Sequence, residues 1–83
     1  MTIEITMPKF GQTMTEGTIL EWLKEVGEYI QKGEVFLQIE SDKAALDVEA
    51  EHSGYLLKTT AAEGEEVPCG QVVAYMGDEE EVS

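Results

Sequence analysis

The chain has 83 residues, of which eighteen are Asp or Glu and five are Lys, so its net charge is −13. A chain this short buries a single small core, which excludes a multidomain enzyme. Its negative charge argues against nucleic acid or an anionic membrane as a partner, and no stretch reaches the roughly 20 apolar residues of a membrane-spanning helix. We therefore expect a soluble domain whose docking partners carry positive charge.

Short runs of β-branched and apolar residues, separated by glycine, predict an all-β domain with almost no helix. In chain order, we expect strands near residues 2–7, 17–23, 35–40, 44–50, 54–60 and 71–76, with short extended pieces around 29–30 and 66–67. Residues 1–77 then form one domain. Residues 78–83 are an acidic run with one valine, and we interpret them as a tail or the start of a linker.

An internal repeat links the two halves of the chain. At a constant offset of 37 residues, Gly17, Gly27 and Gly33 match Gly54, Gly64 and Gly70. Because glycine reaches positive φ without steric cost, the match predicts that the same turns are used twice, with Gly27 and Gly54 as structural turn residues. Neither half can bury its apolar face alone, so we expect two similar half-sheets packed as a flattened sandwich or barrel.

Residues 35–50 alternate apolar and polar side chains on both sides of a short polar centre, which predicts a hairpin folded about the Asp42–Lys43 peptide. In this register Ile39 faces Leu46, Leu37 faces Val48 and Val35 faces Ala50, while Gln38 and Phe36 face Asp47 and Glu49. A shift by one residue would set apolar side chains against Asp47, so the pattern specifies the register. Lys43 is then held at the apex.

Lys43 is the candidate functional residue, although an exposed lysine on a turn is more commonly only solvated. Its placement favours function, because it lies between two strands near the midpoint of the repeat, where large partners can reach it. Asp42 beside it offers a modifying enzyme both a position and a charge to recognise. For Glu40 we keep two interpretations, a solvated turn residue or a part of this recognition.

The segment IESDKAALDVEA, with its Asp42-Lys43-Ala44 tripeptide, resembles the lipoylation motif in the lipoyl domains of 2-oxo acid dehydrogenase acyltransferases. The resemblance runs from about Ile3 to Met76 and includes MPKFGQTMTEGTILEWL and GEEVPCGQVVAYM. It implies a flattened barrel of two four-stranded antiparallel sheets related by a quasi-twofold axis. The positions that match the family's core are Ile30, Phe36, Ile39, Val48 and Leu56.

The same resemblance implies that lipoate is joined to the Lys43 amine as an amide by a lipoate-attaching enzyme. Ala44 and Asp42 then belong to the motif which that enzyme recognises. Three further partners are implied: a thiamine-diphosphate-dependent decarboxylase, an acyltransferase catalytic domain and a dihydrolipoyl dehydrogenase, between which the swinging arm carries acyl groups and reducing equivalents. The domain would contribute no catalytic residue of its own.

Several expectations concern the rest of the protein. We expect pyruvate as the 2-oxo acid, with acetoin cleavage as the second choice. We also expect an isolated domain that is monomeric and was cut from a longer dihydrolipoamide acyltransferase. The N-terminus does not read as a secretory signal. We therefore expect a bacterial cytoplasmic protein, or a mitochondrial matrix protein if a transit peptide was removed.

By resemblance, the loop from Lys9 to Thr15 lies near the lysine turn and helps the decarboxylase recognise its own lipoyl domain. Its candidate recognition residues are Phe10, Gly11 and Met14, with packing as an equal alternative for Phe10 and Met14.

The remaining unusual residues predict no further site. Trp22 and Phe36 are interpreted as packing residues. Cys69 is the one cysteine of the chain and has no metal-ligand spacing around it, and His52 has no nearby nucleophile to assist. We expect no metal.

Three other interpretations share parts of this pattern. A biotin carrier domain has the same fold but typically places methionine on both sides of its lysine, where this chain has Asp42 and Ala44. The lipoylated glycine-cleavage carrier is longer and carries additional helical structure. An unmodified barrel-sandwich module, acting as a structural or adaptor part of an assembly, would leave Lys43 free.

Overall fold

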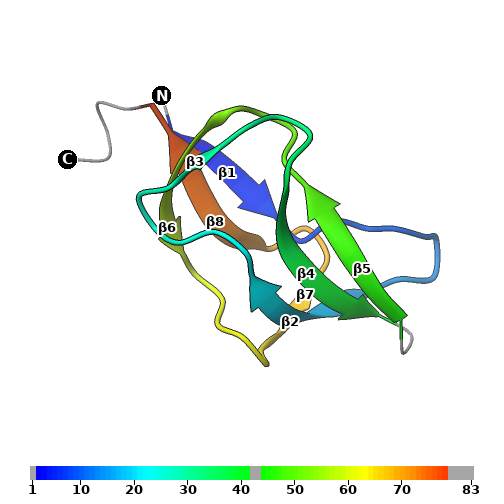
Figure 1. The fold of residues 1–83 in the computed structure, drawn as a ribbon. Coiled ribbons are helices and arrows are strands. Elements are labelled where there is room, and N and C mark those ends of the chain that lie inside the picture. The colour runs from blue at the N-terminus through cyan, green and yellow to red at the C-terminus, as the bar shows by residue number, and fades with distance from the viewer. Residues whose placement is uncertain (1, 42–43, 79–83) are drawn as a thin grey trace.

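The computed structural model describes residues 2–41 and 44–78, and these form eight β-strands without a helix (Figure 1). Each strand begins and ends within one residue of its predicted range. In this part of the chain there is consequently no helix that could cross a membrane. The strands are β1 (Ile3–Thr6), β2 (Glu16–Trp22), β3 (Tyr29–Ile30), β4 (Val35–Ser41), β5 (Ala44–Glu49), β6 (Gly54–Thr59), β7 (Glu66–Pro68) and β8 (Val72–Gly77).

The strands form two antiparallel sheets of four, ordered β1-β8-β6-β3 and β5-β4-β2-β7. The repeat relates β2, β3 and β4 to β6, β7 and β8. Each half therefore contributes its short strand, β3 or β7, to the edge of the sheet built mainly by the other half. This exchange interlocks the halves, and it confirms the predicted flattened barrel of two four-stranded sheets.

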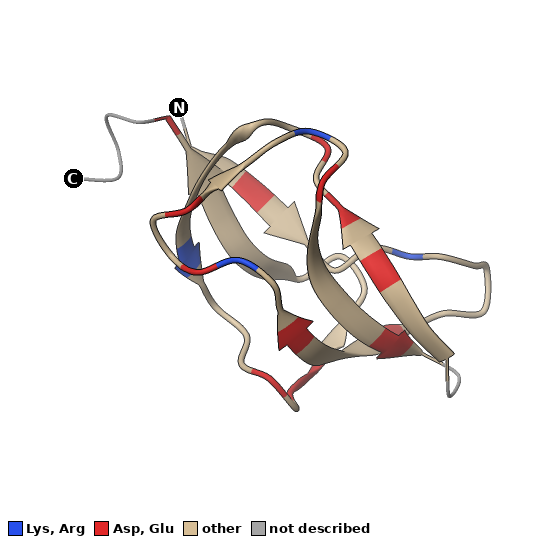
Figure 2. Cartoon of the chain, viewed as in Figure 1, with Lys and Arg blue, Asp and Glu red and all other residues tan. Residues whose placement is uncertain are grey.

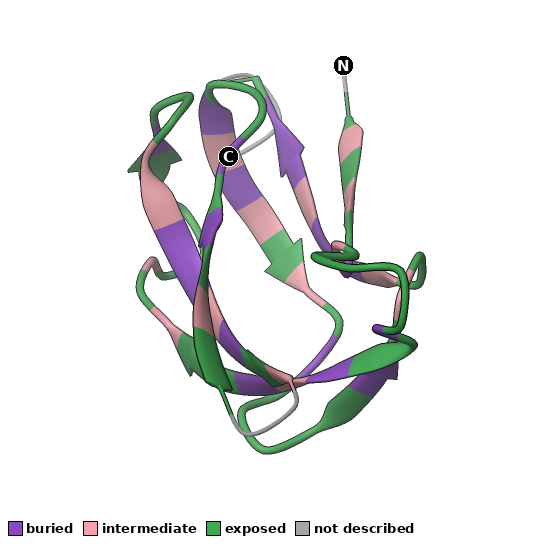
Figure 3. Ribbon diagram, turned by 90° about the vertical axis from the view of Figure 1, so that its right-hand side faces the viewer, coloured by how far each residue is buried: buried purple, intermediate pink, exposed green. Residues whose placement is uncertain are grey.

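The core lies between the sheets and is formed by apolar side chains, and Figure 3 shows the buried positions in purple on strands of both sheets. All five positions expected from the family resemblance are buried, and no described polar or charged residue is buried with them. Full burial of a large aliphatic or aromatic side chain contributes about 1.5–3 kcal/mol, so this layer supplies most of the favourable energy of folding. The largest fully buried side chains are Phe36, Met7, Ile19, Ile30, Leu37, Ile39, Leu56, Met76, Val67 and Val73.

The 37-residue repeat reappears as matched backbone hydrogen bonds across the core. Gly27 N–H donates to the Leu56 carbonyl, and its equivalent Gly64 N–H donates to the Ile19 carbonyl, both at 2.7 Å. Both glycines have positive φ, +98° and +88°, as a turn of this kind requires. Each half therefore closes a turn against the strand of the other half, and the predicted role of Gly27 as a turn residue is confirmed.

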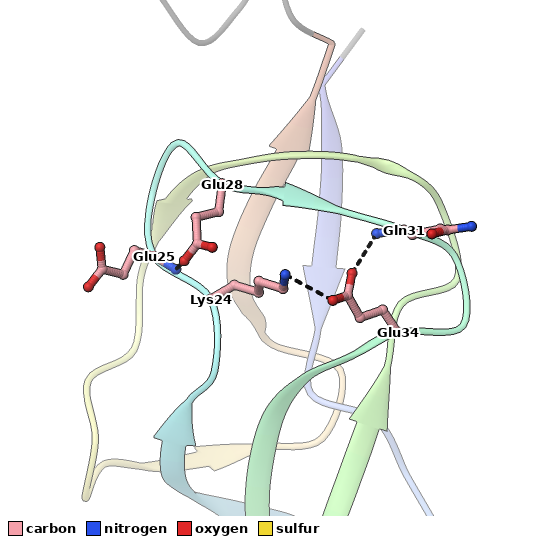
Figure 4. A network of polar contacts seen from close by, with 5 residues as sticks. All are labelled: Lys24, Glu25, Glu28, Gln31 and Glu34. Carbon is pink, nitrogen blue, oxygen red and sulfur yellow. Dashed lines mark hydrogen bonds and ion pairs between the residues drawn. The ribbon is translucent and has the colours of Figure 1, made fainter.

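Glutamate side chains complete these paired turns. Glu28 accepts a hydrogen bond from Glu25 N–H at 2.8 Å, and its equivalent Glu65 accepts one from Ala62 N–H at 3.0 Å. In the first half the network extends further, because Glu34 accepts from Gln31 N–H at 3.0 Å and pairs with the Lys24 ammonium at 2.9 Å (Figure 4). The hydrogen bond from the Gln31 backbone N–H lowers the pKa of Glu34 most, and the interaction with the Lys24 ammonium lowers it further.

The predicted turn at Gly54 is wrong. Gly54 is the first residue of β6, it is buried, and it is not among the glycines with positive φ. Glycine is required there for space, because an added Cβ would lie 3.0 Å from the Gly77 carbonyl oxygen of the neighbouring strand. Its equivalent Gly17 lies in β2, where the nearest atoms belong to the flexible ends of Met7 and Met14.

This difference predicts unequal effects of the same substitution at equivalent positions. Gly54→Ala should destabilise the domain by about 1–3 kcal/mol, since a backbone carbonyl cannot move aside without disturbing the β6–β8 pairing. Gly17→Ala should cost less, because the methionine side chains can rotate. Urea unfolding measures both, with Gly11→Ala as control, since nothing lies within 4 Å of a Cβ added there. Equal stability of the Gly54 and Gly11 variants would contradict the steric explanation.

Candidate functional site

The hairpin of β4 and β5 carries the candidate lysine between its strands. Leu37 pairs with Val48, Gln38 with Asp47 and Ile39 with Leu46, which confirms the predicted register over this stretch. The Gln38 amide also donates to the Asp47 carboxylate at 3.1 Å. Pairing continues to Ser41 and Ala44. Asp42 and Lys43, the residues between this last pair, lie outside the described residues.

A bulge changes the pairing at the other end of the hairpin. The register shifts between Val35 and Leu37, so that Val35 pairs with Glu49, and the predicted pairs Val35–Ala50 and Phe36–Glu49 are wrong. The extra residue interrupts the alternation, which allows the neighbours Phe36 and Leu37 both to point into the core. The Phe36 ring lies 6.3 Å from that of Trp22, whose indole N–H donates to the Ala61 carbonyl at 2.9 Å. Both aromatic residues are packing residues, as predicted.

The hairpin is supported by pairing of its strand β4 with the neighbouring strand β2 of the same sheet. β4 is an interior strand between β5 and β2, and Thr18 of β2 pairs with Glu40 near the end of β4. Ile39, one residue earlier, is fully buried and pairs with Ile19. The strands therefore pair as far as Ser41 and Ala44, and Glu40 and Ala44 are exposed.

The hairpin and the chain ends lie at opposite ends of the molecule (Figure 1). At the end away from the hairpin, Ile3 of β1 pairs with Met76 of β8. Under the quasi-twofold relation, β4 and β5 correspond to β8 and β1. The position equivalent to the connection between β4 and β5 is therefore where the described chain begins and ends.

Both ends of the loop between β1 and β2 form backbone hydrogen bonds with the segment that follows β7. Met7 N–H donates to the Gln71 carbonyl, and Cys69 N–H donates to the Thr15 carbonyl, both at 2.9 Å. Met14 is 5% exposed and belongs to the core, which corresponds to the packing alternative and corrects its assignment as a surface recognition residue. Phe10, at 50% exposure, and Gly11 lie on the surface and remain accessible to a partner.

A polar depression of about 190 Å³ connects this loop to the end of β4 that precedes the lysine turn. The expected proximity of loop and hairpin is therefore present in the described residues. Sequence reasoning missed this depression, because its members come from a loop and three strands that only the sheet brings together. Its lining residues are Thr13, Met14, Thr15, Glu16, Gly17, Thr18, Glu40, Ser41 and Glu66.

Two carboxyl groups meet in this depression. Glu16 opposes Pro68 and Thr18 opposes Glu66, which brings the side chains of Glu16 and Glu66 together on neighbouring strands. Their hydrogen bond and their mutual repulsion raise the pKa of Glu16 above its ordinary value of 4.5. Across the described residues, no group of three or more His, Cys, Asp or Glu side chains is arranged to hold a metal ion.

Comparison with known proteins identifies the family. The biotin and lipoyl family model, described as biotin-requiring enzyme, matches residues 3–76. The chain is 40% identical over 81 residues, 98% of its length, to the dihydrolipoyllysine-residue acetyltransferase component of the acetoin cleaving system of Bacillus subtilis, and covers 20% of that protein. It is 44% identical over 77 residues, 93% of its length, to acetyltransferase component 4 of the chloroplastic pyruvate dehydrogenase complex of Arabidopsis thaliana, and covers 16% of it.

Two solved structures share the fold. The lipoyl domain of the 2-oxoglutarate dehydrogenase complex from Azotobacter vinelandii matches with a TM-score of 0.74 and 30% identity, over 92% of this chain and 96% of that one. Urea carboxylase from Kluyveromyces lactis matches with a TM-score of 0.77 over 93% of this chain and 6% of that one. At 22% identity, the second match shows the fold alone.

The chain thus belongs to the family of biotin and lipoyl attachment domains. Within that family, it is a lipoyl domain of the kind found in the acyltransferase components of 2-oxo acid dehydrogenase complexes. It spans about a fifth or less of the length of the curated relatives it matches.

Because the pKa of Glu16 is raised, removing its negative charge by substitution should increase the stability of the domain in a way that depends on pH. A carboxyl whose folded pKa is raised binds its proton more tightly in the native state, so it lowers stability above that pKa and ceases to do so as the pH falls below about 4.5. Glu16→Gln should therefore raise the thermal midpoint at pH 7 and leave it nearly unchanged at pH 3.

The control for this experiment is Glu4→Gln, which removes one charge from the exposed face of β1. Both variants reduce the overall self-repulsion of the acidic chain equally, so the excess gain of the Glu16 variant isolates the contact with Glu66. Identical midpoint shifts at pH 7 would show that this contact has no effect on stability.

Proposed function

We propose that this domain is a lipoyl carrier whose Lys43 amine holds lipoate as an amide. The observation that carries the proposal is the β4–β5 hairpin, whose strands pair in register up to Ser41 and Ala44 on either side of the Asp42-Lys43 dipeptide. A primary amine at this point is the group that amide formation requires. The family membership and the matching tripeptide support the same assignment.

In this role, the residues of the chain hold and present the arm and take no part in acyl transfer or redox chemistry. The bound dithiolane would supply acyl transfer and redox chemistry, while β2 and the apolar core support β4, the strand that precedes the attachment residue. Tethering through short flexible links gives the arm an effective concentration of about millimolar at successive active sites.

The proposed partners follow from the complexes named for its relatives. They are a lipoate-attaching enzyme, a thiamine-diphosphate-dependent decarboxylase, an acyltransferase catalytic domain and a dihydrolipoyl dehydrogenase. Acidic side chains on β4 and β5 flank the lysine turn, so partners with a basic rim are favoured (Figure 2). Exposed Phe10, Gly11 and Glu40, with Asp42 and Ala44, are proposed to be recognised there. We place the protein in a bacterial cytoplasm, or in a mitochondrial matrix after removal of a transit peptide.

For the 2-oxo acid, we favour pyruvate, with acetoin cleavage second. Relatives with 44% and 40% identity belong to a pyruvate dehydrogenase complex and an acetoin cleaving system. The preference is tested by offering the lipoylated domain to each purified decarboxylase with its substrate and comparing the rates of reductive acylation. A faster reaction with a 2-oxoglutarate decarboxylase would overturn it.

Attachment itself is tested by incubating the domain with lipoate, ATP and a lipoate–protein ligase, with a biotin ligase and biotin in parallel. We expect one lipoyl increment in the intact mass, mapped to Lys43, and no increment for Lys43→Arg, which keeps the charge but loses the primary amine. A biotin increment would assign the domain to carboxylases. No increment from either enzyme would favour an unmodified structural module.

The carrier role also predicts that Lys43 can be removed without loss of the fold. Lys43→Ala should change the free energy of unfolding by less than about 0.5 kcal/mol, as is usual for surface substitutions away from special contacts. Urea unfolding measures this change, and Ile39→Ala is a matched comparison in the same hairpin that should cost about 2–5 kcal/mol because Ile39 is fully buried. A large loss of stability in the Lys43 variant would mean that the lysine is structural.

A further inference from the structure

A groove opens on the side of the barrel where the edge strands β1 and β5 of the two sheets lie. Its volume is about 740 Å³, much larger than the polar depression beside the loop. The side chains that line it include apolar groups from both sheets and from the loop after β1. These are Ile5, Pro8 and Phe10 on one side and Phe36, Val48 and Ala50 on the other.

The margin of the groove carries mainly negative charge. Glu4 lies on the β1 side and Asp47 and Glu49 on the β5 side, where Figure 2 shows acidic positions on both strands. Glu51, His52 and Lys32 line the end beyond β5. Carboxylates on both sides disfavour an anionic ligand, while the apolar lining favours a hydrocarbon chain. The class of ligand that fits is therefore apolar and uncharged.

We infer that this groove binds the acyl arm attached to Lys43 of the same domain, an inference that rests on the proposed function. β5 begins at Ala44, the residue after Lys43, and reaches the groove at Asp47 and Val48. The three steps from Ala44 to Asp47 rise about 10 Å in an extended strand. A lysine side chain joined to an octanoyl chain spans about as many bonds as the backbone of four residues, which covers the one residue from Lys43 to Ala44 and these three steps, so its apolar end reaches the groove at Asp47.

Because the arm is tethered to the same domain, the groove can be occupied even if its intrinsic affinity for the arm is low. An arm held on the same domain is present at an effective concentration of about millimolar, so an intrinsic dissociation constant of about 1 mM keeps the groove half occupied. A separate protein partner would have to bury about 800 Å² on each side for a stable complex. The groove is thus suited to a small tethered ligand that leaves readily when a partner enzyme competes for it.

The first test compares the unmodified and lipoylated domains by NMR, after intact mass has established complete modification. We expect chemical-shift changes at the methyl groups of Ile5, Val48 and Ala50, and cross-relaxation between these methyls and the methylene protons of the arm. Unchanged groove resonances in fully lipoylated protein would overturn the inference while leaving the carrier function intact. Changes that grow with protein concentration would also overturn it, since they would indicate the arm of a second molecule.

The second test needs no modification of Lys43 and therefore remains valid if the proposed function fails. Titrating the unmodified domain with lipoamide, an uncharged probe, should shift the same groove resonances with a dissociation constant of about 1 mM. Anionic lipoate should bind more weakly because of the acidic margin. The groove assignment is overturned if lipoamide leaves these resonances unchanged, or if lipoate binds equally well.

A pair of variants assigns the binding to the groove. Phe10→Ala should weaken lipoamide binding about fivefold, since it removes one apolar wall. Tyr29→Ala is the matched control, because Tyr29 is an aromatic residue of the same 50% exposure on β3, away from the groove lining. Equal effects of the two variants would show that the probe binds exposed aromatic surface in general and would overturn the inference.

Discussion

Neither sheet of this domain can remove its apolar face from water without the other, and this mutual burial is the constraint on which the rest of the structure depends. The exchange of β3 and β7 between the halves makes the dependence reciprocal. So do the matched bonds from Gly27 to Leu56 and from Gly64 to Ile19. Because each half closes the turns of the other, the domain has one core despite its internal repeat, and a change in either half affects both.

The function we propose depends on the point at which this symmetry is broken. In one half, only Asp42 and the candidate Lys43 separate the end of β4 from the start of β5. At the equivalent position in the other half, β8 and β1 contain the two ends of the described chain. The connection that carries the candidate lysine and the two ends of the described chain therefore occupy equivalent positions in the two halves.

Among the described residues, the core contains only apolar side chains, and all the charged side chains lie outside it. No described charged residue is buried, and acidic groups accumulate on the surface until some repel one another, as Glu16 and Glu66 do. Such repulsion costs stability, which a core of large aliphatic side chains offsets. It also leaves a strongly negative surface around the hairpin, and this favours basic partners over nucleic acid or anionic membranes.

Much of the fold could be predicted because the predictive signals are local. Alternation of apolar and polar residues between Leu37 and Val48 specifies strand register, since a slip of one residue would bury Asp47. The bulge at Phe36 escaped this reasoning, because Val35, Phe36 and Leu37 are three successive apolar residues and their pattern does not show where the register shifts. Gly54 was misassigned for a similar reason, since its need for glycine comes from Gly77, more than twenty residues away.

The sequence by itself determined the all-β class, the strands, the repeat and the candidate lysine. Each of these depends on neighbouring residues or on a constant spacing along the chain. Only the tertiary structure decided which loop residue is buried, which carboxyl groups meet and where a groove opens. Met14 enters the core, Glu16 meets Glu66 and Phe10 lines the groove beside β5 because distant strands pair in three dimensions. Such contacts depend on sheet order and twist, which no local pattern encodes.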